Sequence, residues 1–192
     1  MTNVFNKKNI FRFVLCALPM LIVCTANVAA QESASHTVHI GVSPITVMSV
    51  SGDPLPFIVD KSAAIDQIVA TDASTFYNLT TNIEGVFIQA ELDLPMPEGS
   101  ELWISGLSSL GMTHGKVQLK GGSPLQFISG ISRGFENGQS IEYAFVTSPD
   151  AEDIPFQSRS VTLTLVDRAN GRQEQHTQTV YFSTQSVGST ER

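Results

Sequence analysis

The sequence predicts an all-β protein whose strands form two mainly antiparallel sheets packed as a sandwich, either immunoglobulin-like or jelly-roll-like. Three observations favour this class. Apolar and polar residues alternate with period two through much of the chain, as in residues 86–94. Turn-forming Gly, Pro and Asn residues recur at intervals of roughly 8–12 residues. No amphipathic helix of normal length separates the strands, whereas parallel crossovers usually need one.

Residues 1–30 have the pattern of a secretory signal peptide. The basic residues Lys7, Lys8 and Arg12 precede an apolar run over residues 13–23, and small residues continue to Ala30. This run is much shorter than the roughly 20 residues of a membrane-spanning helix. We therefore expect export to the periplasm, cell surface or medium, cleavage after Ala30, and no membrane span afterwards.

Both cysteines, Cys16 and Cys24, lie inside this predicted leader. Cleavage after residue 30 would leave a chain with neither a thiol nor a disulfide, so its fold must depend on core burial alone. The alternative is a lipid anchor at Cys24, although the branched Val23 stands where lipoprotein signals normally have a small residue.

The remaining chain has the length of one domain. We expect a flexible N-terminus at 31–37, a single sandwich at 38–184 and a flexible tail at 185–192. The leader carries three of the basic residues and none of the acidic ones, so its removal lowers the formal net charge from −7 to −10. Such an acidic surface repels nucleic acid, which we exclude as a partner.

The first two β-rich runs are VHIGV (38–42) and ITVMSV (45–50), which are separated by Ser43 and Pro44. Because proline has no amide hydrogen, the strand must break or lie at an edge there. A turn cluster, SGDPLP, follows at 51–56. Residues 61–70 fit either a helical turn or a short strand.

Residues 75–82 and 86–94 alternate most clearly. Val86, Ile88, Ala90, Leu92 and Leu94 share one face of the second run, and the residues between them are mostly polar. The interruption Asn82–Gly85 has the length and composition of a hairpin loop.

The C-terminal half continues as short alternating runs, which brings the expected total to nine or ten strands. Asn137-Gly138 is a frequent tight-turn pair. Residues expected to face inward include Ile141, Tyr143 and Phe145, and later Val161, Leu163, Leu165, Val180 and Phe182. The runs are 101–107, 116–119, 125–131, 140–148, 158–167 and 176–184.

Two groups of carboxylates invite a functional interpretation. Glu91 and Asp93 lie on one face of a strand, about 7 Å apart, but they alternate with apolar residues and fit the solvated face of a sheet better than a catalytic pair. Asp150, Glu152 and Asp153 could supply calcium ligands, yet they lack the spacing of a known calcium loop. We interpret this loop as a solvated turn.

The remaining chemistry-bearing residues form no recognisable site. His36 and His39 would point to opposite faces of a strand, and the other histidines are isolated. The sequence contains no G-x-S-x-G nucleophile motif and no phosphate-binding loop. We therefore expect no catalytic residues, no metal, no cofactor and no enzyme activity.

Trp103 is the single tryptophan. It alternates with Leu102 and Ile104, which places it on the opposite, outer face of its strand. It could stack on a sugar ring, or it could cover an edge or a loop.

Residues 75–167 resemble a group of uncharacterised exported bacterial β-sandwich proteins. The resemblance rests on TFYNLTTN at 75–82, Met96-Pro97-Glu98-Gly99 before a strand, Ile141-Glu142-Tyr143 and VTLTL at 161–165. It implies a sandwich and an envelope location, and no catalytic residue. The layout is also similar to that of fimbrial or coat subunits, although chaperone–usher pilins usually carry a disulfide.

These expectations combine into one hypothesis and one alternative. The protein is expected to be a non-catalytic structural or interaction subunit of the cell envelope. It would bind itself or another envelope protein by strand addition, with residues Thr37–Val50 as donor or edge strand. The alternative is a carbohydrate-binding module that uses Trp103 as its stacking platform.

Overall fold

The computed structural model describes residues 37–62 and 66–186. It divides the chain into two compact units, Met1–Val42 and Ser43–Arg192. Of the first unit it describes only residues 37–42, which form neither helix nor strand. The predicted leader 1–30, Cys16, Cys24 and His36 lie outside the described residues. In the described part of the chain, no helix is long and apolar enough to cross a membrane.

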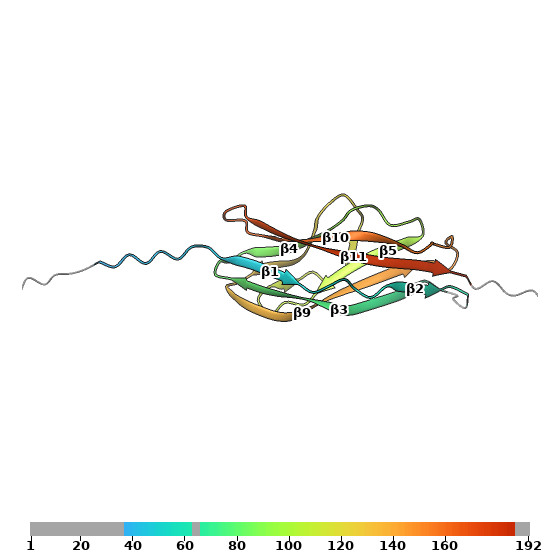
Figure 1. Ribbon diagram of the computed structural model, residues 1–192, viewed down its shortest axis with the longest axis horizontal. Helices are drawn as coiled ribbons and strands as arrows, with labels where there is room; N and C mark the ends of the chain where they lie inside the picture. The colour runs from blue at the N-terminus through green and yellow to red at the C-terminus, as the bar shows by residue number, and fades with distance from the viewer. Residues whose placement is uncertain (1–36, 63–65, 187–192) are drawn as a thin grey trace, which may run out of the picture. The chain divides into compact units, whose positions relative to one another are not determined.

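The second unit contains eleven strands among its described residues, arranged in two layers (Figure 1). One sheet has the order β1-β3-β9-β5-β7 and the other β2-β11-β10-β4-β8-β6. All pairings are antiparallel except that of β2 with β11. The predicted all-β sandwich is confirmed. The strands are β1 (Thr46–Val50), β2 (Phe57–Asp60), β3 (Ile68–Thr81), β4 (Val86–Leu92), β5 (Ser100–Gly106), β6 (Met112–Thr113), β7 (Val117–Leu119), β8 (Leu125–Ile131), β9 (Gly134–Thr147), β10 (Gln157–Val166) and β11 (Gln173–Gln185).

The core forms between the inner faces of the two sheets, where alternate residues of each strand are buried. In β4 the pattern follows the sequence prediction from Val86 to Leu92, but Leu94 is exposed because the strand ends at Leu92. Phe57, Phe145 and Phe182 stack on one another across the sheets, so this aromatic contact ties β2 and β11 to β9.

The N-terminal run is divided between the two units. The predicted strand at 38–42 is not formed, whereas residues 46–50 form β1, which pairs with β3. The chain then crosses at residues 51–56 to the other sheet, where β2 lies parallel to β11. β1 and β2 are therefore consecutive in sequence but are edge strands of opposite sheets.

The loop Asn82–Gly85 is not a hairpin loop, contrary to the sequence prediction. β3 belongs to the first sheet and β4 to the second, so this loop carries the chain across the sandwich. Asn82 fixes it by accepting from the amide of Ile45 and donating to the carbonyl of Ser43. Its length and composition suit a tight connection, but they do not specify which strands it joins.

Asn137-Gly138 forms a bulge inside β9 rather than the predicted tight turn. Tyr77 of β3 pairs with Gln139 and Leu79 pairs with Glu136, so Asn78 alone opposes both residues. Gly138 has a φ of 64°, a conformation that glycine adopts readily, and its amide donates to Asn78 Oδ1 at 2.8 Å. The extra residue reverses which side chains of β9 face the core.

The ambiguous segment 61–70 ends in a strand, because β3 begins at Ile68 and runs for 14 residues. Asp72 is buried near the first register shift between β3 and β9, and it accepts from Ser74. The short-strand alternative is therefore correct for residues 68–70.

Candidate functional site

The first feature that the fold leaves unexplained is the apolar alternation of residues 37–42. Val38, Ile40 and Val42 expose 77, 83 and 75% of their surface. In an extended chain, residues two apart lie on one face, so once the segment is drawn out as a strand these three form an apolar stripe with His39 and Gly41 opposite. Exposed apolar area of this kind costs free energy in water unless a partner covers it.

Edge strand β1, by contrast, is paired with β3 on one side and bonded at Met48 on the other. Ile45 O accepts from Asn82 N, and Ser51 N donates to Phe76 O. Because ladder bonds alternate in an antiparallel pair, the backbone groups of Met48 point away from β3. Its amide donates to Glu174 Oε2 at 2.8 Å, and its carbonyl accepts from His176 Nε2 at 2.8 Å.

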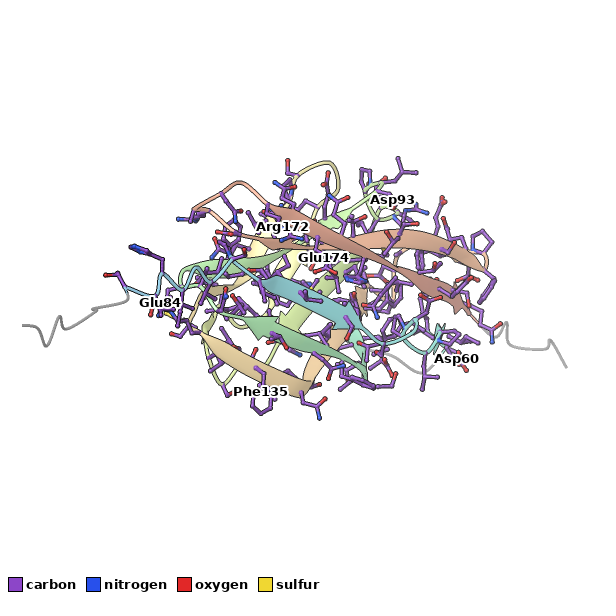
Figure 2. The ribbon with its side chains drawn as sticks, turned by 60° about the vertical axis from the view of Figure 1, so that its left-hand side comes forward. Asp60, Glu84, Asp93, Phe135, Arg172 and Glu174 are labelled. Atoms are coloured by element: carbon purple, nitrogen blue, oxygen red, sulfur yellow. The ribbon has the colours of Figure 1, made fainter. Side chains whose placement is uncertain are left out.

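Glu174 and His176 come from β11 of the opposite sheet (Figure 1), and they alternate in step with its inward residues Val180 and Phe182. Figure 2 labels Glu174 on the side of β11 next to β1. Gln178 continues the row. It accepts from the Tyr143 hydroxyl and donates to the carbonyls of Ser51 and Gly52 in the crossover. We call Glu174, His176 and Gln178 the polar seam. It satisfies backbone groups that would otherwise offer a pairing edge to another chain.

The other edge strands in the described ranges are short. β2 has four residues, β7 three and β6 two. Short edges offer few unpaired amides, which is a common protection against unwanted strand pairing. Strand addition onto this sandwich would therefore have little free edge to use, and residues 37–42 are better suited as a donor than the domain is as an acceptor.

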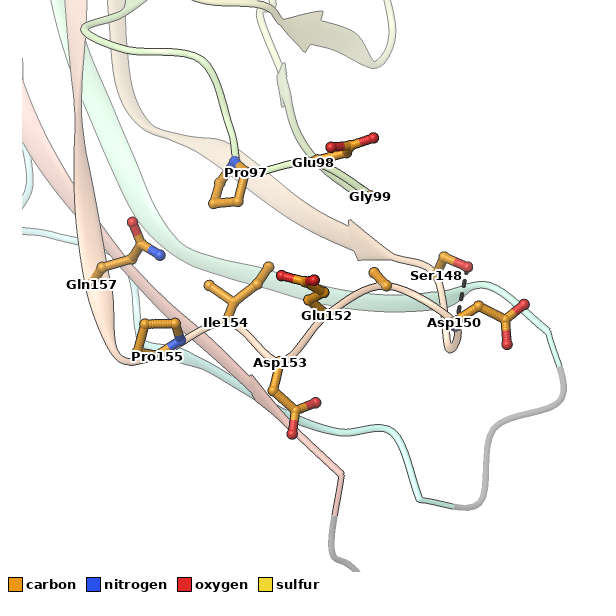
Figure 3. Close-up of a pocket in the computed structure, with 11 residues that line it drawn as sticks. Pro97, Glu98, Gly99, Ser148, Asp150, Glu152, Asp153, Ile154, Pro155 and Gln157 are labelled. Carbon is orange, nitrogen blue, oxygen red and sulfur yellow. Dashed lines mark hydrogen bonds between the residues drawn. The ribbon is translucent and has the colours of Figure 1, made fainter.

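An open cavity of about 650 Å³ lies at the end of the sandwich, around the acidic loop (Figure 3). Its walls come from the turn before β5 and from the segment that joins β9 to β10. The lining residues are Pro97, Glu98, Gly99, Ser148, Asp150–Pro155 and Gln157.

Lys61 fastens the acidic loop to the end of β2. Its side chain is only 1% exposed, and Nζ lies 3.0 Å from Asp153 Oδ1 and donates to the carbonyl of Ala151. Asp153 also accepts from the amide and hydroxyl of Ser186. The Ser186 amide and then Lys61 hold the pKa of Asp153 below its ordinary value. This carboxylate is therefore occupied in holding the loop in place.

The carboxylates around the cavity do not converge. In Figure 3, Glu98 and Asp150 come from opposite walls, and Asp153 points away from Glu152. Among the described residues, no three His, Cys, Asp or Glu side chains are grouped so that they could hold a metal ion. The interpretation of residues 150–153 as a solvated turn stays a prediction.

Glu136 is a buried carboxylate that sequence reasoning missed. It is only 3% exposed, although Phe135 beside it is 76% exposed. Its Oε1 accepts from the Ser108 hydroxyl at 2.8 Å, from the Leu110 amide at 2.9 Å, and from both the amide and hydroxyl of Ser109. Glu136 therefore organises the loop that follows β5.

Tyr77 completes this cluster. Its hydroxyl lies 2.8 Å from both Glu136 Oε2 and the carbonyl of Leu107, and it donates its single proton to one of them at a time. Burial acts to raise the pKa of Glu136, but the bonds from Leu110, Tyr77 and the serines outweigh it and lower the pKa. Burial and the neighbouring carboxylate raise the pKa of Tyr77. A satisfied, ionised carboxylate of this kind stabilises a loop and is poorly suited to accept a proton near neutral pH.

The residues singled out in the sequence remain separate. Trp103 is half-buried on the outer face of β5, between Ala144 and Gln118 in register, and its Nε1 donates to Glu101 Oε2 at 2.9 Å. Glu91 faces Thr162 on the outer face of the other sheet. Asp93 lies just beyond the end of β4 and accepts from the amide of Leu94. The sugar-stacking role of Trp103 stays a prediction.

The polar seam can be found in the sequence when the alternation of residues 176–184 is extended toward the N-terminus. Val180 and Phe182 were expected to face inward, and counting back in twos gives Gln178, His176 and Glu174. No comparable signal exists for Glu136, because the bulge that turns it inward depends on the pairing with β3.

Comparisons with known proteins assign no family. No protein-family model matches the sequence, and no curated protein matches it. Solved structures with a similar arrangement include the N-terminal domain of PorA (TM-score 0.40, 7% identity), which covers 75% of this chain and 100% of that chain. Another is AggA, the major subunit of aggregative adherence fimbriae type I from Escherichia coli (TM-score 0.33, 11% identity). That match covers 78% of this chain and 100% of AggA.

A family 123 glycoside hydrolase from Clostridium perfringens also matches, with a TM-score of 0.31 and 8% identity over 74% of this chain and 28% of that chain. A fimbrial subunit thus occurs among the structural neighbours. At these scores the similarities do not assign the chain to any of these groups, and no argument below depends on them.

Proposed function

We propose that the protein is an exported, non-catalytic subunit of the cell envelope that joins a partner by adding its segment Thr37–Val42 as a β-strand. The observation that carries the proposal is the exposed stripe of Val38, Ile40 and Val42 directly before a complete sandwich. Strand addition gives such a segment backbone hydrogen bonds and buries alternate side chains in pockets of the partner.

We shorten the proposed donor segment from Thr37–Val50, as expected from the sequence, to Thr37–Val42. β1 has a ladder with β3 on one side and the polar seam on the other, and Met48 is part of the core. Removal of residues 46–50 would therefore damage the domain itself. The segment 37–42 can be changed without touching the core, which makes it the suitable target for an experiment.

The partner is another envelope protein or a second copy of this chain. Because the sandwich offers only short edges, two copies would pair through their own residues 37–42. Size-exclusion chromatography with light scattering, over a range of concentrations, tests pairing between two copies with the processed protein and a variant that lacks residues 37–42. Phe135→Ser, which changes an exposed apolar residue elsewhere, is the matched control. We expect self-association in the processed protein and in the control, but not in the deletion variant.

A photo-crosslinking residue at Ile40, introduced in the native host, tests for a different partner. We expect a specific adduct from position 40 and none from the same group at position 135. If the purified protein stays monomeric and position 40 yields no adduct, strand addition is rejected.

Export is tested separately by the intact mass of the protein recovered from the periplasm or medium. Cleavage after Ala30 predicts a chain that begins at Gln31. A lipid-modified chain that begins at Cys24 would instead support the anchored alternative, and a full-length mass would contradict export.

A further inference from the structure

Two aromatic rings lie exposed on the outer face of the sheet that contains β10 and β11. Phe156 precedes β10 and is 61% exposed, and Tyr181 of β11 is 36% exposed. Their ring centroids are 5.7 Å apart, and the ring planes are within 10° of parallel. Tyr181 thus holds Phe156 in one orientation while much of the Phe156 ring remains open to solvent.

The outward residues of β10 and β11 alternate with the core residues and carry no charge, whereas the neighbouring strand β4 places Glu91 opposite Thr162 on the same face. The inward positions of β10 and β11 include Arg159, Glu174 and His176. Thr164 and Val166, at the far end of β10, are buried. We call the remaining outward residues the hairpin outer face: Ser158, Ser160, Thr162, Gln173, Gln175, Thr177, Thr179, Tyr181, Ser183 and Gln185.

The register brings hydroxyl groups next to the aromatic pair. Ser158 lies opposite Tyr181, Ser160 opposite Thr179, and Thr162 opposite Thr177. Each hydroxyl can both donate and accept a hydrogen bond. The face thus combines rows of hydroxyls, amides at its margin and one aromatic platform. These groups are complementary to a ligand that itself presents hydroxyls and a flat C–H surface.

We propose that the hairpin outer face, together with Phe156, is a binding site for a neutral polysaccharide. The C–H face of a sugar ring carries partial positive charge and stacks on the negative π-face of an aromatic ring. The Ser and Thr hydroxyls then bond the hydroxyls of the adjacent sugar units. Phe156 also lies between Pro155 and Gln157, two residues of the cavity wall, so a chain that stacks on Phe156 reaches the rim of that cavity.

The chemistry of this face favours a glycan over other ligands. Protein interfaces are depleted in serine at their centres and enriched in Arg, Met and large aromatic residues, whereas this face offers two rings among small hydroxyl residues. The outward residues of β10 and β11 include no basic group, and the chain has a net charge of −7. This face therefore does not attract an anionic polymer. The site is also distinct from Trp103, which lies on the other sheet.

Native affinity electrophoresis tests the proposal with gels that contain hydroxyethylcellulose, barley β-glucan, xylan or glycol chitin, and with alginate as the anionic comparison. We expect at least one neutral polymer to retard the protein. Phe156→Ala should weaken the binding by roughly threefold or more, because the aromatic stacking platform is removed. Tyr181→Ala should weaken it less, and Tyr181→Phe should retain most of it because the ring remains.

Trp103→Ala and Phe135→Ala serve as controls and should bind like the parent protein. Thermal unfolding checks that the Phe156 and Tyr181 variants are folded, which their exposed positions favour. The variant that lacks residues 37–42 should still bind glycan, which separates this site from strand addition. The proposal is overturned if no neutral polymer retards the protein, if only alginate does, or if Phe156→Ala leaves retardation unchanged.

Discussion

The two halves of the N-terminal run have the same alternation but different surroundings. Val38, Ile40 and Val42 continue in step with Thr46, Met48 and Val50, since all six occupy even positions. In β1 the even positions Thr46 and Met48 are buried, while those of residues 37–42 are exposed. Alternation therefore indicates that a segment can form a strand, but it does not indicate whether the partner strand belongs to the same chain.

The difference lies in the partners that the fold supplies. β1 receives a ladder from β3 on one side, and on the other side the polar seam bonds the amide and the carbonyl of Met48. Residues 37–42 form no strand with any described residue. Four substitutions test this contrast, beginning with the one that should change stability most.

Met48→Ala should destabilise the domain by about 2–5 kcal/mol, the usual cost when a buried methionine is truncated and a cavity remains. Met48 is 2% exposed and belongs to the core cluster. The free energy of unfolding in urea measures the effect, with Ile40→Ala as the matched control. Equal effects at both positions would show that residues 37–42 are also packed within the domain.

Glu136→Gln tests the bulge that sets the register of β3, the partner of β1. Loss of charge-assisted hydrogen bonds should cost on the order of 1.5–3 kcal/mol at neutral pH. The pKa of Glu136 is lowered from its ordinary 4.5. Its contribution is therefore complete above that pH and is lost as pH falls through the lower, folded-state pKa.

Urea unfolding at several pH values below neutrality measures this contribution. The parent protein should lose stability in acid more steeply than Glu136→Gln, because only the parent has the Glu136 carboxylate to protonate. Asp153, whose pKa is also lowered, is present in both proteins and does not contribute to the difference. Parallel acid profiles would mean that Glu136 does not contribute through its charge.

Glu174→Ala removes the acceptor of the Met48 amide and opens the outer edge of β1. A buried donor left without a partner costs about 1–3 kcal/mol, and water can offset part of this cost at an edge. Hydrogen exchange at the Met48 amide should accelerate, whereas exchange at amides in β10 should not change. The isosteric Glu174→Gln keeps an acceptor and should retain most of the protection.

Ile40→Ser should change the free energy of unfolding by less than about 0.5 kcal/mol, as expected for an exposed position outside the core. Its effect should appear instead in association, measured by light scattering as described above. A large loss of stability without any change in association would contradict the donor role of this segment.

The strands of this protein could be predicted from the sequence because burial of one face imposes period two on the residues themselves. The alternation of Val86 to Leu92 gives both the strand and its inward face, and the same holds for Ile141 to Phe145. This information is local, since each side chain reports its own surroundings. The alternation of Val38, Ile40 and Val42 is also visible in the sequence, where it predicts a donor or edge strand.

Only the tertiary structure decided which segments meet. The loop at Asn82–Gly85 could serve a hairpin or a crossover, because its composition does not encode the sheet to which the next strand belongs. Simple alternation would place Phe135 inside and Glu136 outside, yet the bulge at Asn137-Gly138 reverses them. Pairing between distant strands determines such features, so they depend on contacts that no short stretch of sequence contains.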